Sequence, residues 1–213
     1  MLPDEAAARR ELLRFVRRGA REGVLRGTFG NVSVRIGAHL LITPTASDYL
    51  RLRAGDFARV RLDGQVEDGN PSSELGLHLA IYRSMAQVEA VWHDHAAYGV
   101  AAALLTDAVP IFTGEGHGLI GIDLPVARYR PAGSQELAQE AAELMVTRRA
   151  SACLLRNHGL CATGRNLMEA YSCAIAADEA AQHFLLTRGL EPAALPQEEK
   201  ERIRRDFTGY HMH

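Results

Sequence analysis

Strand patterns and helix patterns alternate along the whole of the 213-residue chain, and several strands are joined only by tight turns. Apolar residues recur at every second position in a strand, as at 31–36, and three or four positions apart in a helix, as at 5–22. The strand at 57–62 ends at Asp63-Gly64, a typical hairpin turn. A parallel sheet needs a long crossover after each strand. We therefore expect one mixed α/β domain with hairpins over residues 1–213, not a purely doubly wound sheet.

The remaining elements follow from the same two periodicities and from turn and capping residues. We expect further strands at 39–43, 88–93, 109–113, 124–130 and 152–156, and helices at 71–85, 96–105, 134–149, 166–188 and 197–207. The glycine-rich segment 114–118 is expected to be a flexible loop, and residues 191–213 a tail laid over the body.

The strand predicted at 88–93 leads directly into His93-Asp94-His95. Side chains at positions i and i+2 of a strand point to the same face, so the two imidazoles would lie side by side while Asp94 points away. Two neutral imidazoles in this arrangement suit a divalent transition metal. A short His-x-His is a weak motif, however, and two ordinary loop histidines are the alternative.

A third histidine follows another apolar strand. Residues 152–156 run into Asn157-His158-Gly159, where we expect Gly159 to adopt a positive φ in a turn. A histidine at such a boundary can reach into a cleft. Three protein ligands leave one coordination position open, which is typical of a catalytic metal site.

Two segments could bind an anion. The turn Gly27–Gly30 can direct backbone N–H groups at an anion, although the same pattern is typical of a hairpin entrance. The helix that begins near Pro71 has Ser72 or Ser73 as a possible N-cap and Glu74 in its first turn. A carboxylate there complements the helix dipole, so Glu74 can be a helix-start residue as well as a site residue.

Charge and cysteine content exclude some classes of function. A net charge of −2 argues against a nucleic-acid-binding surface, and no apolar run is long enough to span a membrane. The first residues do not resemble a signal peptide, and the three cysteines form no CxxC pair. We expect reduced core thiols in a cytoplasmic protein. His211 and His213 form a second His-x-His, expected to be solvated and open to adventitious metal.

Five separated motifs together resemble the class II aldolase/adducin family, from about residue 6 to the C-terminus. They are Gly30–Arg35, Ile42–Thr45, Pro71–Glu74 with His78 and Tyr82, His93-x-His95, and Asn157–Gly159. The resemblance implies a single domain with a mixed, mostly antiparallel central sheet covered by helices on both faces. It also implies a homotetramer with active sites at subunit interfaces.

The resemblance assigns roles to individual residues. It implies that His93, His95 and His158 bind a metal, usually zinc, and that Glu74 is the acid/base carboxylate. It implies a phosphate pocket formed by Thr28, Asn31, Thr45, Ala46, Ser72 and Ser73. Tyr210, in a C-terminal tail that packs near the active site, corresponds to a proton-donating tyrosine.

The chain departs from the family pattern at three places. Ala46 stands where the aldolases usually have glycine, and its Cβ could crowd an amide that should face phosphate. The family's second tyrosine would fall near Gly114, where only Glu115 and His117 are available. Asp94 lies between two metal histidines, and we expect its role to be structural.

The resemblance favours a metal-dependent aldolase that cleaves a phosphorylated sugar. The substrate would be a fuculose-1-phosphate-like ketose 1-phosphate, cleaved to dihydroxyacetone phosphate and an aldehyde through a metal-stabilised enediolate. The alternative is a decarboxylase, epimerase or dehydratase that uses the same metal site on a related sugar or sugar-acid phosphate. A non-catalytic, adducin-like scaffold has no use for Glu74 together with three metal histidines.

Overall fold

Nine strands form one sheet within residues 5–207, the part of the chain that the computed structural model describes. Their order across the sheet is β4-β3-β2-β1-β5-β9-β8-β7-β6. All neighbouring pairs are antiparallel except β7 and β8. The strands are β1 (Asn31–Ile36), β2 (His39–Ile42), β3 (Ala58–Arg61), β4 (Val66–Asp68), β5 (Ala90–Asp94), β6 (Ala108–Pro110), β7 (Asp123–Ala127), β8 (Ala152–Leu155) and β9 (Gly159–Gly164). The expected mixed, mostly antiparallel sheet is confirmed.

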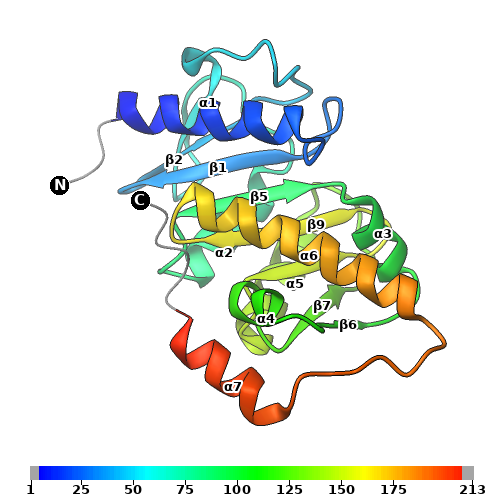
Figure 1. Ribbon diagram of the computed structural model, residues 1–213. Coiled ribbons are helices and arrows are strands. Elements are labelled where there is room, and N and C mark those ends of the chain that lie inside the picture. Colours follow the sequence, from blue (N-terminus) through cyan, green and yellow to red (C-terminus); the bar gives the residue numbers. More distant parts are fainter. Residues whose placement is uncertain (1–4, 208–213) are drawn as a thin grey trace.

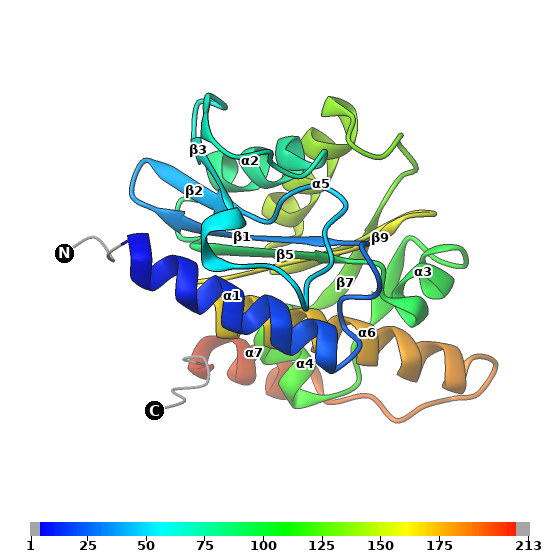
Figure 2. The same ribbon diagram turned by 90° about the horizontal axis from the view of Figure 1, so that it is seen from above.

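Helices cover both faces of this sheet (Figure 1). The helices are α1 (Glu5–Arg21), α2 (Leu75–Ser84), α3 (Ala97–Ala103), α4 (Gly114–Leu119), α5 (Gln135–Arg148), α6 (Leu167–Thr187) and α7 (Gln197–Asp206), with a short 3₁₀ turn at Ala54–Asp56. Figure 2 shows α2 and α5 on one side of the sheet and α1, α4 and α6 on the other. Among the helices between residues 5 and 207, none has the length and apolar character needed to cross a membrane.

Strand β5 shows how the sheet separates two apolar cores. Ala90 and Trp92 belong to the core under α1 and α6, whereas Val91 belongs to the core under α2 and α5. Strand side chains alternate between faces, so His93 points to the α2 and α5 side. All five residues of β5 are buried, because paired strands flank it and helices cover both faces.

Several local predictions were wrong. The glycine-rich segment 114–118 is not a loop but helix α4, capped by Thr113, whose side chain accepts from the Gly116 amide. The helix predicted from Pro71 begins at Leu75, with Glu74 at the N-cap position and no side-chain cap, so neither Ser72 nor Ser73 caps it. Strands β4 and β9 were missed; β9 is a central, buried strand without polar alternation.

Gly159 was expected at positive φ, but the left-handed residue of this turn is Asn157, at φ 60°. The glycine is needed for a different reason. A Cβ on Gly159 would overlap the backbone oxygen of Asp94 and lie 3.1 Å from His93 Cε1. A glycine here therefore lets β9 approach β5 closely enough to pair with it beside the histidines.

The three cysteines, Cys153, Cys161 and Cys173, are buried and unpaired, as expected of core thiols. Burial raises the pKa of the Cys153 and Cys173 thiols to about 12, so they are held neutral.

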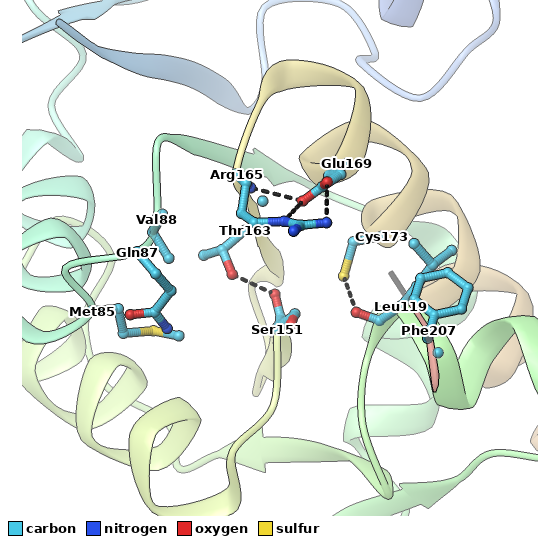
Figure 3. Close-up of a pocket in the computed structure, with 12 residues that line it drawn as sticks. Met85, Gln87, Val88, Leu119, Ser151, Thr163, Arg165, Glu169, Cys173 and Phe207 are labelled. Carbon is cyan, nitrogen blue, oxygen red and sulfur yellow. Dashed lines mark hydrogen bonds and ion pairs between the residues drawn. The ribbon is translucent and has the colours of Figure 1, made fainter. Parts of the chain in front are cut away.

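The chain after α6 crosses to α7 and ends, in the described part, at Phe207. The Phe207 ring packs where a Cβ on Gly118 of α4 would lie. Figure 3 shows it beside Leu119 and Cys173 in a pocket of about 230 Å³, which also includes Val88 and Gly164. Val88 precedes β5 and Gly164 ends β9, so Phe207 lies at the opposite end of these strands from His93. Packing of residues 191–213 near an active site stays a prediction.

Candidate active site

His93, His95 and His158 meet at one end of the sheet. Their ring centroids are 4.9–5.2 Å apart in all three pairings. His93 is in β5 and His95 follows that strand, while His158 is in the turn between β8 and β9. Pairing of β5 with β9 places Asp94 opposite Leu160, which brings the turn against the histidine pair. The alternation that predicted two imidazoles on one face is thus seen in the geometry.

Glu74 completes this cluster from the start of α2. One potential ligand atom from each of Glu74, His93, His95 and His158 lies within 4.8 Å of all the others. Glu74 Oε2 is 2.9 Å from His93 Nε2, and Glu74 Oε1 is 3.2 Å from His158 Nε2. At the N-cap position the Glu74 carboxylate points toward the histidines and makes no capping hydrogen bond to the helix backbone.

The ligand atoms of the cluster face one another with lone pairs, without hydrogens between them. His93 Nδ1 lies 2.8 Å from the Leu160 carbonyl oxygen and donates its hydrogen there. The neutral ring then has only a lone pair at Nε2, facing a carboxylate oxygen. Within residues 5–207, His93 Nε2 and Glu74 Oε1 are buried without a hydrogen bond. A cation between these atoms, either a proton or a metal ion, would satisfy both, and three imidazoles with a carboxylate fit a divalent transition metal.

The protonation states suit metal binding. Burial, aided by the charge of His93, lowers the pKa of His158 to about 4, and burial also lowers the pKa of His95. Burial lowers the pKa of His93 as well, but the adjacent Glu74 carboxylate outweighs it and the net shift is upward. For Glu74, burial raises the pKa, whereas His93, His158 and Asn31 lower it to well below its ordinary value. Near neutral pH the cluster is therefore a carboxylate with at least two neutral imidazoles.

Asp94 faces the opposite side of the sheet from the two flanking histidines. Its Oδ2 accepts from Trp92 Nε1 at 3.0 Å, and its Oδ1 accepts from the Ala96 amide at 2.8 Å. Burial raises the pKa of this carboxyl to about 7. These contacts tie the end of β5 to the start of α3, in keeping with the expected structural role.

A pocket of about 320 Å³ opens beside the cluster. Glu74, His95 and His158 line it, and so do all six residues that the resemblance assigned to phosphate: Thr28, Asn31, Thr45, Ala46, Ser72 and Ser73. Ala46 has φ 48°, a left-handed conformation that favours glycine. This conformation accounts physically for the glycine that the family usually has there. The assigned phosphate roles remain predictions.

Five lining residues had no assigned role: Phe29, Gly30, Pro44, Ala132 and Gly133. Phe29 stacks on His95, with ring centroids 5.3 Å apart and an interplanar angle of 20°, and is 60% exposed. The sequence signal that could have indicated a pocket role for Phe29 is the presence of an aromatic residue inside a glycine-rich turn. Ala132 and Gly133, between β7 and α5, carry no chemistry that sequence reasoning could have recognised.

The proposed substitutes for the absent second tyrosine do not line this pocket. His117 is buried in α4, and its Nδ1 donates to the Gly121 carbonyl oxygen at 2.9 Å. Glu115 belongs to the same helix. Tyr210, His211 and His213 lie outside the described residues.

Comparison with known proteins agrees with the resemblance. Residues 10–185 match the model of the class II aldolase and adducin N-terminal domain. The chain is 33% identical to 5-deoxy-D-ribulose 1-phosphate aldolase of Bacillus thuringiensis over 95% of this chain and 96% of that protein. It is 35% identical to 5-methylthioribulose-1-phosphate/5-deoxyribulose-1-phosphate aldolase of Rhodospirillum rubrum, over 96% of this chain and 92% of that protein. A solved L-fuculose 1-phosphate aldolase superposes with a TM-score of 0.87 and 30% identity, over 94% of this chain and 95% of that one.

Proposed function

This chain is a metal-dependent aldolase of the class II aldolase and adducin family, and on that premise we propose that it cleaves a ketose 1-phosphate to dihydroxyacetone phosphate and an aldehyde. Its substrate resembles fuculose 1-phosphate in the phosphorylated, keto end of the molecule. The observation that carries the proposal is the convergence of His93, His95, His158 and Glu74 beside a polar pocket.

The three histidines of the cluster, with Glu74 beside them, would hold the metal, which we propose to be Zn²⁺. When bound, such an ion supplies Lewis-acid stabilisation of the negative charge that develops on the substrate oxygens. His93 lies on a central strand, His95 directly follows that strand, and His158 lies in a tight turn. His93 is held further by its bond to the Leu160 carbonyl.

Glu74 moves the proton at the carbon next to the carbonyl. In cleavage, the bond between C3 and C4 breaks, the C4 hydroxyl loses its proton, and C4 leaves in the aldehyde. The electron pair left at C3 then takes up a proton. Glu74, a carboxylate at rest, takes this proton from solvent, to which the C4 hydroxyl proton is released in exchange, and delivers it to C3. In the reverse direction the same carboxylate removes that proton. We assign the exchange at the C4 oxygen to Tyr210, on the resemblance alone.

The polar pocket binds the phosphate through hydroxyls and backbone amides. Thr28, Thr45, Ser72 and Ser73 supply the hydroxyls, and the lining residues include no lysine or arginine. Neutral donors fix the orientation of a phosphate without a dedicated cation. A volume of about 320 Å³ suits a small sugar phosphate.

We also propose a cytoplasmic homotetramer with active sites at subunit interfaces. The unpaired thiols suit a reducing compartment. Phe207, the last described residue, lies at the far end of β5 from the histidines, and this supports contribution of the C-terminal segment to a neighbouring subunit's site.

Metal content combined with a cleavage assay tests the proposal. Protein purified without chelator or affinity tag should hold about one divalent metal per chain, and the His93→Ala, His158→Ala double variant should hold none. The wild type should release dihydroxyacetone phosphate from 5-deoxyribulose 1-phosphate or fuculose 1-phosphate, and much less ketone from the unphosphorylated sugars. Absence of metal from the wild type would overturn the metal site.

A second candidate keeps the metal site but changes the reaction to a decarboxylation, epimerisation or dehydration of a sugar or sugar-acid phosphate. Ala46 favours it, because a Cβ at a left-handed position lines the part of the pocket assigned to phosphate. Analysis of the products distinguishes the candidates. Aldol cleavage splits the carbon chain into dihydroxyacetone phosphate and an aldehyde. Epimerisation and dehydration keep the carbon chain intact, and decarboxylation releases CO₂.

A further inference from the structure

A row of buried polar side chains leads away from Glu74 into the protein. Glu74, His78 and Tyr82 recur at every fourth position from the start of α2 and therefore share one helix face. Asn31 and Ser33 recur at every second position of β1 and share one face of the sheet. The two sets meet between α2 and the sheet, and all five residues are buried.

The contacts form a continuous chain. Asn31 Nδ2 donates to Glu74 Oε2 at 3.0 Å, and Asn31 Oδ1 lies 2.5 Å from His78 Nε2. The other ring nitrogen, His78 Nδ1, lies 2.6 Å from Ser33 Oγ, which in turn lies 2.8 Å from the Tyr82 hydroxyl. Helix and strand residues alternate along the row.

Only one arrangement of hydrogens satisfies every contact. A carboxylate accepts but cannot donate, so the Asn31 amide must turn its NH₂ toward Glu74 and its oxygen toward His78. His78 must then carry its hydrogen on Nε2 and accept from Ser33 at Nδ1. Burial lowers the pKa of His78 to about 3, so the ring is neutral and has one donor and one acceptor, as the chain requires.

We propose that His78 is a positioning residue for the reaction, which acts through Asn31 to fix the orientation of the Glu74 carboxylate. A Glu74 side chain anchored only by the backbone could rotate, whereas an Asn31 amide locked by His78 holds one of its oxygens in place. Ser33 and Tyr82 hold the imidazole in the required tautomer, as an outer partner does for many site histidines. The kinetic part of this inference rests on the proposed function.

Two variants of one residue test the role. His78→Leu removes both ring contacts and frees the Asn31 amide to turn over. We expect kcat to fall roughly 10- to 100-fold, KM to change much less and metal content to stay the same, because the carboxylate is misplaced while the histidines and the pocket hydroxyls remain. His78→Gln can still donate to Asn31 Oδ1 and should recover most of the loss. Equal losses in both variants would overturn the proposal.

A stability-matched control separates positioning from packing. Ile81 is fully buried in α2 but lies outside the polar row. Ile81→Ala should lower the melting temperature at least as much as His78→Leu, while kcat measured well below that temperature stays close to the wild-type value. If Ile81→Ala lowers kcat equally, His78 is a packing residue only.

A spectroscopic measurement makes the inference independent of turnover. In metal-free protein labelled with ¹⁵N-histidine, NMR should show His78 neutral with its hydrogen on Nε2 between pH 5 and 8. A hydrogen on Nδ1, or a charged ring, would be incompatible with the deduced directions of the hydrogen bonds and would overturn the proposal. A wild type without any cleavage activity but with the expected tautomer would instead remove the proposed function and leave the hydrogen-bond chain standing.

Discussion

At the residue scale, Glu74 is the group whose chemistry can be isolated most cleanly. Glu74→Gln keeps the shape and still accepts from Asn31, but cannot accept or deliver a proton. We expect a loss of roughly 10²- to 10⁴-fold in kcat, the usual contribution of a general acid or base. Steady-state cleavage kinetics with parallel metal analysis measure this, and the histidines should still retain metal. Full turnover by the variant would exclude Glu74 as the base.

The buried neutral state of His78 predicts a pH dependence of stability. Its pKa is about 3 in the folded protein and 6.5 in its ordinary state. Below pH 6.5 the unfolded chain therefore binds a proton that the folded protein does not, so the free energy of unfolding falls as pH falls toward 3. In metal-free protein, the slope between pH 6 and 4 should be steeper in the wild type than in His78→Gln by up to about 1.4 kcal/mol per pH unit. Denaturant unfolding across this range measures it; equal slopes would contradict the buried neutral ring.

At the element scale, the approach of β9 to β5 depends on Gly159. In Gly159→Ala the new Cβ would overlap the Asp94 backbone oxygen, so the two strands must separate beside His93. We expect the free energy of unfolding to fall by about 1–3 kcal/mol, as for overpacked cores, with weaker metal binding. Chemical denaturation and metal titration test both effects.

Gly76 provides the matched control for that substitution. It is exposed in α2, and a Cβ there would meet nothing within 4 Å. Gly76→Ala should therefore stabilise the protein by up to about 1 kcal/mol through helix propensity, with unchanged metal binding. Equal behaviour of the two variants would show that crowding at Gly159 does not matter.

Elements with local signals could be predicted from sequence. Ser134 and Asn166 cap α5 and α6 as their side chains suggest, and the alternation at β5 gives the facing of His93. The failures at β9 and α4 share one cause, which is tertiary packing without a local pattern. Strand β9 is buried on both faces and shows no alternation. In α4, a Cβ on Gly116 would lie 2.7 Å from the Ile111 side chain, so the glycine reflects close packing, not flexibility.

The residues of the candidate site also differ in whether a local sequence pattern could indicate them. Spacing alone indicated the His93 and His95 pair, and the family resemblance supplied the pocket residues around it. The row from Asn31 to Tyr82 could not be derived, because its contacts depend on how α2 sits across β1. The two-residue period of a strand and the four-residue spacing along a helix each describe one element. Neither pattern predicts which strand a helix packs against.

At the scale of the whole molecule, the two ends of β5 and β9 have different surroundings. The histidine cluster lies at one end, and Phe207, which leads toward Tyr210, lies at the other. In the homotetramer proposed above, a neighbouring copy would bring its own C-terminal segment to the cluster.

Mixing two inactive variants tests that assembly. Glu74→Gln removes the carboxylate from one chain, and Tyr210→Phe removes the tyrosine hydroxyl from another. If each site takes Glu74 from one subunit and Tyr210 from its neighbour, random reassembly of equal amounts restores about a quarter of the sites, since each contributing chain is the correct one half of the time. Activity after joint unfolding and refolding should then approach 25% of the wild type, whereas each variant refolded alone stays inactive. If both groups came from one chain, no mixture could contain an intact site, and the recovered activity would remain at the level of the separate variants.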